Sequence, residues 1–404
     1  MDRKHIQFIK TTHNHESVSE QQRVINNMRK NIKRKAQDDL FNKPSKLVCN
    51  EVKGKERMLN MKNVKNFYQS VYRQRKRNSK PLPKSIEQSL QYLEEEVEKE
   101  SFVKRVDKNK QIVLLTSDED LMLLSNNSSN VFCDGTFRYS PSFFQQMYTF
   151  FVLVNGYYIA VAFFLLQNKK SCTYERMLQI LFEECRKLGL SLSIDTITID
   201  FEQAMIKAIR KLLPSVVIRG CRFHLGQSWL RKIQSLGLLN IYKDRENNQG
   251  RWLKNIFGFP AVDSNLVRNL FFEYTNSVDC DEQIQTFINY LDENYLKDDS
   301  HFPPNMWASL LTQDFVSTNN GAEAFHRHFG DLFGYLKSNP DIFYFLYIMK
   351  EYQSLKKIKL NSSKPIKTSP LNEFKNDHNQ LQLGLISIHI FLNKISKKML
   401  PVRL

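Results

Sequence analysis

TITIDFEQAMIKAIRKLLP, residues 196–214, carries the signals that decide the fold of this chain. The β-branched residues at 196–199 predict a short buried strand, and this strand ends in Asp200. The segment after Glu202 has apolar residues at helical spacing and stops at Pro214, which predicts a helix. A strand that leads directly into a helix is the unit from which parallel sheets are built. The position of an acid, Asp200, at the end of a buried strand then requires a physical explanation.

The most apolar run, FFVLVNGYYIAVAFFLLQ at residues 150–167, sets another part of the sheet. Its length approaches that of a membrane-spanning helix. However, Asn155-Gly156 lies near its centre between β-branched and aromatic residues, and this dipeptide is the strongest short signal for a hairpin. We therefore predict two buried antiparallel strands here, with a membrane helix as the alternative interpretation.

The flanking segments predict a mixed sheet with helices against it. QIVLLTSD and NVFCDGTF, within 111–137, are typical of strands, with the turn residues NNSSN between them. Residues 173–189 and 203–213 have helical periodicity, and VVIRGC at 216–221 predicts a further strand. Residues from about 240 to 312 indicate helices and loops. The expected fold class is α/β, with the hairpin antiparallel and the helix-linked strands parallel.

The net charge of +17 is concentrated in the N-terminal part of the chain. Residues 1–84 hold 22 Lys and Arg against 7 Asp and Glu, whereas all later residues hold 37 against 35. A basic arm joined to a nearly neutral body indicates a polyanionic partner, most often nucleic acid. The alternative is a solvated tail without a defined partner.

The cysteine pattern favours a reducing compartment. The six cysteines lack the paired spacing of a disulfide framework. The polar, basic N-terminus has no secretory signal. Both observations argue against a small secreted disulfide scaffold.

Three acids have positions that fit a metal-dependent active site. Asp134 is near the end of the first strand of the body, Asp200 closes its strand, and Glu323 is early in a predicted helix. Neighbouring parallel strands bring both aspartates to one carboxyl-terminal edge, and a helix crossing that edge could add Glu323. Clustered carboxylates repel one another and suit Mg²⁺ or Mn²⁺. Two ions roughly 3.5–4 Å apart support in-line phosphoryl transfer.

Each acid also has an ordinary explanation when it is taken alone. Asp-Gly is common in turns, and an Asp before a helix is a frequent cap. We interpret Glu202 as a partner of the helix dipole.

The ordered combination is more specific than its parts. CDGTF at 133–137, TIDFEQAMIKA with LLP, GCRFHLGQSWLRKI at 220–233 and STNNGAEAFH at 317–326 resemble the transposase domain of Mutator-like elements, or MULEs. The resemblance covers roughly residues 110–335. It implies a DNA transposase with a ribonuclease-H-like mixed sheet flanked by helices and interrupted by an all-helical insertion at about 225–315. It also implies that Asp134, Asp200 and Glu323 form the catalytic triad.

The motif around Cys221 and His224 matches the Cys-x-x-His motif of that family. From the residues alone, these are two possible zinc ligands, short of a closed site, and a buried thiol beside a hydrogen-bonded His is the alternative. Trp229, Arg231 and Lys232 follow in the same predicted helix. An aromatic ring beside cations could stack on an unpaired base and hold phosphate, and a core Trp is the alternative.

The N-terminal arm resembles the same family in two places. THNHE resembles the end of a FLYWCH-type zinc finger whose last ligands would be His13 and His15, but no cysteine precedes them. Residues 1–20 are therefore expected to be a truncated finger remnant without zinc. Residues 21–109 are expected to be a basic helical DNA-binding arm and linker. FYQSVYRQRKRNSKPLP, 67–83, resembles the family linker, and its cations could lie along a DNA backbone; they are Arg73, Arg75, Lys76 and Arg77.

The full expectation is a divalent-metal-dependent transposase that cleaves and joins transposon-end DNA. The catalytic domain is expected at 110–335 and a C-terminal helical segment at 336–404. The family implies terminal-repeat and target DNA as partners and a homodimer. A DNA substrate implies a nuclear location, for which KNIKRKAQ and KRNSKPLPK are candidate import signals, and the hairpin interpretation of 150–167 predicts no membrane partner. The alternatives are a domesticated or decaying DNA-binding protein without catalysis, an unrelated ribonuclease-H-like nuclease, or a structural interaction protein.

Overall fold

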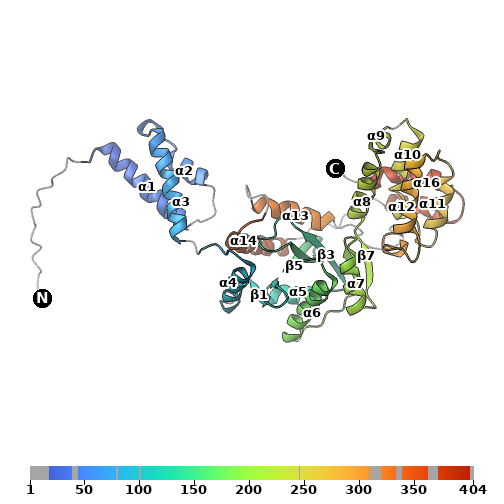
Figure 1. The fold of residues 1–404 in the computed structure, drawn as a ribbon, viewed down its shortest axis with the longest axis horizontal. Helices are drawn as coiled ribbons and strands as arrows, with labels where there is room; N and C mark the ends of the chain where they lie inside the picture. The colour runs from blue at the N-terminus through green and yellow to red at the C-terminus, as the bar shows by residue number, and fades with distance from the viewer. Residues whose placement is uncertain are drawn as a thin grey trace, which may run out of the picture. The chain divides into compact units, whose positions relative to one another are not determined.

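The computed structural model describes residues 18–38, 44–78, 81–99, 102–244, 246–308, 311, 320–333, 339–362 and 372–400. The chain divides into two compact units, Met1–Leu82 and Pro83–Leu404. The first unit is helical, and the second contains a sheet and a helical region (Figure 1).

The described residues of the first unit form three helices and one short 3₁₀ turn: α1 (Glu20–Asp38), α2 (Pro44–Val52), η1 (Glu56–Met58) and α3 (Met61–Asn78). Apolar residues at helical spacing on α1 meet those of α2 and α3 in a small core; the buried members are Ile25, Met28, Ile32, Ala36, Leu47, Val48, Phe67 and Val71. Glu51 is nearly buried and accepts hydrogen bonds from Lys35 at 2.8 Å and Asn31 at 3.0 Å. Burial alone would raise the pKa of Glu51, but these two partners lower it. A charged link therefore joins α1 to α2.

The second unit is built on a seven-stranded mixed sheet with the order β1-β2-β5-β4-β3-β6-β7. The strands are β1 (Val103–Asp107), β2 (Ile112–Leu115), β3 (Asn130–Thr136), β4 (Gln146–Val154), β5 (Tyr157–Leu166), β6 (Thr196–Ile199) and β7 (Val217–Gly220). The first five strands pair antiparallel, and β3-β6 and β6-β7 pair parallel. The predicted mixed sheet with flanking helices is confirmed.

The hairpin prediction for residues 150–167 is also confirmed. Asn155 and Gly156 connect β4 to β5 with φ values of 50° and 77°, the left-handed conformation that such a two-residue turn requires. Among the described residues, no helix has both the length and the apolar character needed to cross a bilayer.

Helices cover both faces of the sheet (Figure 1). On one side lie α5 (Asp118–Asn126), α6 (Ser171–Lys187) and α7 (Gln203–Leu212), and on the other α13 (Asn320–Leu332) and α14 (Ile342–Leu360), with α4 (Ile86–Glu98) next to β1. Aromatic rings join α13 and α14 to the sheet, since Phe163 contacts both Phe329 and Tyr352 at centroid distances of 6.2 and 5.6 Å. The sequence reading missed β1 and α5, because both are short and rich in charge.

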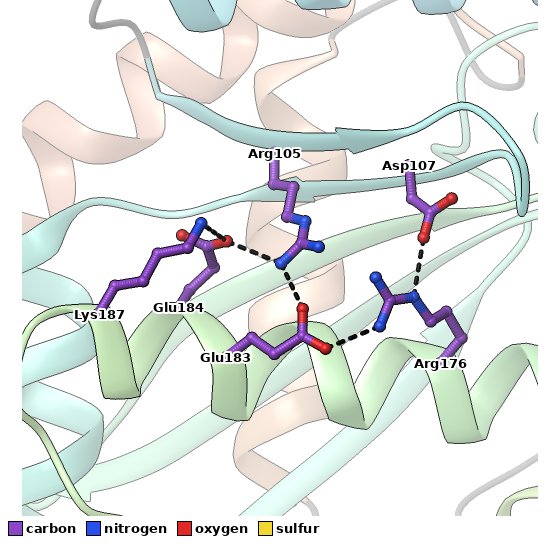
Figure 2. Close-up of polar contacts among 6 residues, drawn as sticks. All are labelled: Arg105, Asp107, Arg176, Glu183, Glu184 and Lys187. Carbon is purple, nitrogen blue, oxygen red and sulfur yellow. Dashed lines mark hydrogen bonds and ion pairs between the residues drawn. The ribbon is translucent and has the colours of Figure 1, made fainter.

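A charged ladder fixes the edge strand β1 to α6 (Figure 2). Arg105 donates to Glu183 at 2.6 Å and to Glu184 at 3.0 Å, and Arg176 donates to Asp107 and Glu183 at 2.8 Å. Burial acts to raise the pKa of Asp107, but Arg176 and its neighbours lower it. The arginines of the ladder likewise lower the pKa of Glu183, so that Asp107 and Glu183 stay ionised.

The remaining helices form one region beside the sheet (Figure 1). It contains α8 (Arg222–Ser235), α9 (Leu239–Lys243), α10 (Asn248–Ile256), η2 (Phe259–Ala261), α11 (Val267–Thr275), α12 (Glu282–Leu291), the π-helical turn η3 (Asp292–Leu296) and η4 (Pro304–Met306). The late elements η5 (Asn372–Phe374), α15 (Lys375–Gln382) and α16 (Ile388–Met399) complete it. Asn255 of α10 accepts from Ser396 at 2.8 Å and donates to Asn393 at 2.6 Å. The last helix therefore packs on α10, far away in the sequence.

A buried ion pair between Asp120 of α5 and Lys356 of α14 gives a testable prediction, since both side chains are only 3% exposed. Lys356→Met leaves an unpaired buried carboxylate and should lower the free energy of unfolding by about 3 kcal/mol. The double variant Asp120→Leu/Lys356→Met should lose less. Urea unfolding followed by Trp fluorescence measures this, because the three tryptophans all lie in the second unit. Equal or greater loss in the double variant would contradict the prediction.

Candidate active site

Asp134 and Asp200 lie next to each other at the ends of two adjacent parallel strands. In the pairing of β3 with β6, Phe132 lies opposite Thr198. Asp134 and Asp200 each follow two residues later, so the two aspartates lie level with each other. Asp134 is 6% exposed. The prediction that these strands are parallel neighbours is confirmed, and both carboxylates lie at the carboxyl-terminal edge where open sheets bind ligands.

The environment of Asp200 favours the neutral acid. Burial is the main cause that raises its pKa to about 7, followed by the negative charges of Asp134 and Glu202, while Lys169 opposes the rise. One carboxylate oxygen of Asp200, Oδ1, is shielded from water and has no hydrogen-bond partner among the described residues. Lys169 and a backbone hydrogen bond therefore compensate the charge of this carboxylate only in part.

Glu202 belongs to a polar wall beside this pair. Tyr174 donates to Glu202 Oε1 at 2.8 Å, and Lys169 Nζ lies 2.9 Å from Glu202 Oε2. Gln146 in turn donates to the Tyr174 hydroxyl at 2.6 Å. Glu202 is the N-cap residue of α7, but its side chain makes no capping hydrogen bond. Its partners are thus side chains of the sheet edge and α6, in addition to any effect of the helix dipole.

His326 is a site residue that the sequence reading did not single out. It lies on α13, and its Nε2 is 3.1 Å from Asp134 Oδ2. This close approach is not a hydrogen bond among the described residues. The ring packs edge-on to Phe151 of β4. The signal in the sequence was the spacing of three residues from Glu323, which is one helical turn.

Glu323 lies on the same helix, one turn before His326. α13 packs against β3 and β5. The side chain of Glu323 lies outside the described part of the structure, so its place in the triad stays a prediction.

Cys221 and His224 begin α8 directly after β7. Cys221 is fully buried, and its backbone N–H donates to Ile199 O at 2.7 Å, which ties the start of α8 to the end of β6. Burial lowers the pKa of His224; Asp134 opposes this, and Arg231 and His326 add to it. His224 therefore lies within electrostatic reach of Asp134. Considering only described side chains, no three His, Cys, Asp or Glu residues form a metal-binding group.

The structure corrects the proposed stacking role of Trp229. Its side chain is 2% exposed and packs against Phe257, Tyr295 and Trp307 in the helical region. A base cannot reach this ring, so the alternative of a core Trp applies. The two cations lie nearer the surface: Arg231 donates to Gln227 at 3.0 Å, and Lys232 lies 5.0 Å from the ring centroid of Tyr290.

In the first unit, Arg73 lines a donor-rich hollow between α1 and α3. The other lining residues are polar or basic, and none is acidic: Arg29, Lys33, Asn66, Gln69, Ser70 and Gln74. Arg29 Nε is shielded from water without a partner in the described structure. Arginine, amide and hydroxyl groups together suit an anion such as phosphate. The side chains of Arg75, Lys76 and Arg77, as well as His13 and His15, lie outside the described residues.

A comparison with protein families identifies the segment that holds these groups. Residues 130–228 match the family model of the MULE transposase domain. This MULE domain runs from the start of β3 into α8 and contains Asp134, Asp200, Cys221 and His224. No curated protein matches the chain.

Among solved structures, the chain is similar to a "Drosophila P element transposase strand transfer complex". The identity is 12%, the TM-score is 0.31, and the match covers 78% of this chain and 91% of that one.

The raised pKa of Asp200 predicts a pH-dependent gain in stability for Asp200→Asn. Between pH 4 and 7 the folded carboxyl keeps a proton that the unfolded chain releases, so the stability of the native protein falls as the pH rises. In EDTA at pH 8, the free energy of unfolding of the variant should exceed that of the native protein by about 1–3 kcal/mol. This gain should shrink towards pH 4. Trp fluorescence during urea unfolding at each pH measures it.

The matched control is Asp195→Asn at the other end of β6, where the side chain is exposed. A gain of the same size and pH dependence in this control would contradict the assigned electrostatic cause.

Proposed function

We propose that this chain is a DNA transposase of Mutator-like type that cleaves transposon ends and transfers the strands by divalent-metal-dependent phosphoryl transfer. The observation that carries the proposal is the adjacency of Asp134 and Asp200 at one sheet edge inside the matched MULE domain. Two poorly compensated carboxylates side by side are costly for stability, and such an arrangement is common in catalytic centres.

The two aspartates fit a hard divalent cation. Asp200 has a shielded oxygen that finds no partner among the described residues, and repulsion from Asp134 contributes to its raised pKa. Carboxylate oxygens are the preferred ligands of Mg²⁺ and Mn²⁺. Asp134 and Asp200 would hold the metal, with Glu323 as the third carboxylate of a two-ion site. Bound there, the ions would supply charge neutralisation at the transferred phosphate and would lower the pKa of the attacking hydroxyl or water.

The residues around the acids have supporting roles in this proposal. His326 approaches Asp134 from α13 on one side of the proposed centre. Lys169 and Tyr174 hold Glu202 by its two oxygens. His224 is an auxiliary group that could position a phosphate, and Cys221 anchors the helix that carries it.

We also propose the finer architecture that the MULE match suggests. The order β5-β4-β3-β6-β7, a hairpin followed by two parallel strands, supports a ribonuclease-H-like core within 110–335. The helices between β7 and α13 then correspond to an insertion at about 225–315. Residues 1–20 would be a segment similar to the end of a FLYWCH-type zinc finger, and 336–404 a C-terminal segment.

The proposed partners are terminal-repeat DNA and a target duplex, bound by a nuclear homodimer. The donor-rich hollow of α1 and α3 supports the DNA-binding part of this proposal, because no acidic residue lines it and it contains two arginines and a lysine. These cations would contact the phosphate backbone and give weakly specific affinity.

The decisive experiment is a strand-transfer assay with the full chain, Mg²⁺ or Mn²⁺, and a duplex that carries candidate terminal repeats. The native protein should give cleaved and joined products. Asp134→Asn, Asp200→Asn and Glu323→Gln should each reduce the rate by at least about 10³-fold, because each removes a ligand of the charge-stabilising centre. Gel separation of end-labelled DNA measures the products.

Asp195→Asn is the control here, since it changes an exposed acid at the opposite end of β6. DNA binding without product from the native protein would support the alternative, a domesticated or decaying DNA-binding protein. Products that persist in all three site variants would contradict the assigned triad.

The salt dependence of DNA affinity gives a separate prediction for the first unit. Arg29→Gln, Lys33→Gln and Arg73→Gln together should weaken binding to any duplex sequence and lower the slope of log K against log salt by about 2–3. Fluorescence anisotropy from low to moderate salt measures the slope. As a control, Lys53→Gln and Lys55→Gln change cations outside the hollow, and an equal loss there would contradict a specific role for it.

A further inference from the structure

The loop between β3 and β4 exposes two aromatic rings at the edge that holds the acids. Phe137, three residues after Asp134, is 50% exposed, and Phe143 is 40% exposed. The next aromatic residues of the loop, Tyr139 and Phe144, are buried. An exposed Phe ring keeps apolar surface in water, so each of these two rings in one loop is available for contact with a ligand.

Phe137 is linked to the acidic pair through one lysine. Lys169 Nζ lies 4.5 Å from the centroid of the Phe137 ring. The same ammonium group is 2.9 Å from Glu202 Oε2, and Glu202 is one of the charges that act on Asp200. An exposed ring and a cation thus lie together beside the proposed reaction centre.

Phe143 is held in an uncommon backbone conformation. Its φ is 75°, in a region that residues other than Gly rarely adopt. Such a conformation lowers the free energy of unfolding by about 1–3 kcal/mol. Neighbouring hydrogen bonds hold the loop in place: Ser142 N donates to Pro340 O at 3.0 Å, and Gln145 N donates to Leu166 O at 2.9 Å. The surrounding structure therefore keeps this ring at the surface against its local preference.

Three amide residues line the same hollow as Phe143. Gln145, Gln167 and Asn339 line a hollow of about 510 Å³ together with Ser142, Phe143 and Phe144. Gln167 Oε1 is shielded from water and has no partner within the described structure. Amides beside an aromatic face are the groups that proteins use to hydrogen-bond base edges and to stack on base faces.

We propose that Phe137 and Phe143 form a stacking platform for unpaired bases of a DNA strand end, next to the acidic pair. Lys169 would favour the adjacent phosphate, and Gln145 and Gln167 would bond the edge of a base in the hollow. This inference rests on the proposed transposase function. It assigns to the β3–β4 loop the role that Trp229, buried in the helical region, cannot perform.

The test compares two DNAs with the full chain in EDTA, where binding is measured without chemistry. One is a duplex, and the other is the same duplex with the last few bases of the strand end unpaired. The native protein should bind the unpaired end about tenfold or more tightly than the duplex, from stacking. Phe137→Ala and Phe143→Ala should each lose most of this preference and keep duplex affinity. Phe137→Trp should retain it.

The matched control is Phe272→Ala in α11. Phe272 is 37% exposed and also lies beside a cation, Arg268, at 5.4 Å, but it belongs to the helical region. If the two loop variants keep the full preference, or Phe272→Ala loses it equally, the platform is wrong while the strand-transfer assay still tests the transposase proposal. If the native protein binds neither DNA, both proposals fail.

Discussion

The parallel pairing of β3 with β6 is the constraint on which the candidate site depends. Its backbone register brings Asp134 level with Asp200. Because side chains alternate between the two faces of a sheet, a slip of one residue in either strand would move one carboxylate to the opposite face. The same pairing fixes α8, since the N–H of Cys221 bonds to the carbonyl of Ile199 at the end of β6. The register of β3 with β6, rather than any single contact of the two aspartates, therefore brings these groups together at the carboxyl-terminal edge of the sheet.

The sequence predicted the parts of the fold that local signals specify. The Asn155-Gly156 turn and the strand that ends in Asp200 were both found, because turn chemistry and β-branched runs act over a few residues. Short charged elements such as α5 were missed, since nine residues with an acidic start resemble a turn. Contacts between distant segments were also missed. His326 approaches Asp134 only because α13 returns across the sheet, and the burial of Trp229 depends on Phe257 and Trp307.

Well-paired and poorly compensated charges lie in different parts of the second unit. On the α6 side, paired charges such as Arg105 with Glu184 and Arg176 with Asp107 satisfy one another. At the carboxyl-terminal edge, Asp134 and Asp200 face each other with incomplete compensation. The well-paired charges and the aromatic contacts of α13 and α14 hold the sheet rigid, so that the edge can keep an arrangement that is unfavourable by itself.

The packing of α16 on α10 has a consequence for the synthesis of the chain. α10 ends at Ile256, and its partner helix begins at Ile388. At typical translation rates of 5–20 residues per second, residue 388 is made on the order of ten seconds after α10. During this time the apolar face of α10 lacks its partner helix. The sheet strands, by contrast, are all complete by residue 220. If the ribosome stalls in this interval, the strands of the sheet are already made but the helical region is incomplete. Its exposed apolar surface is the kind of surface that chaperones bind.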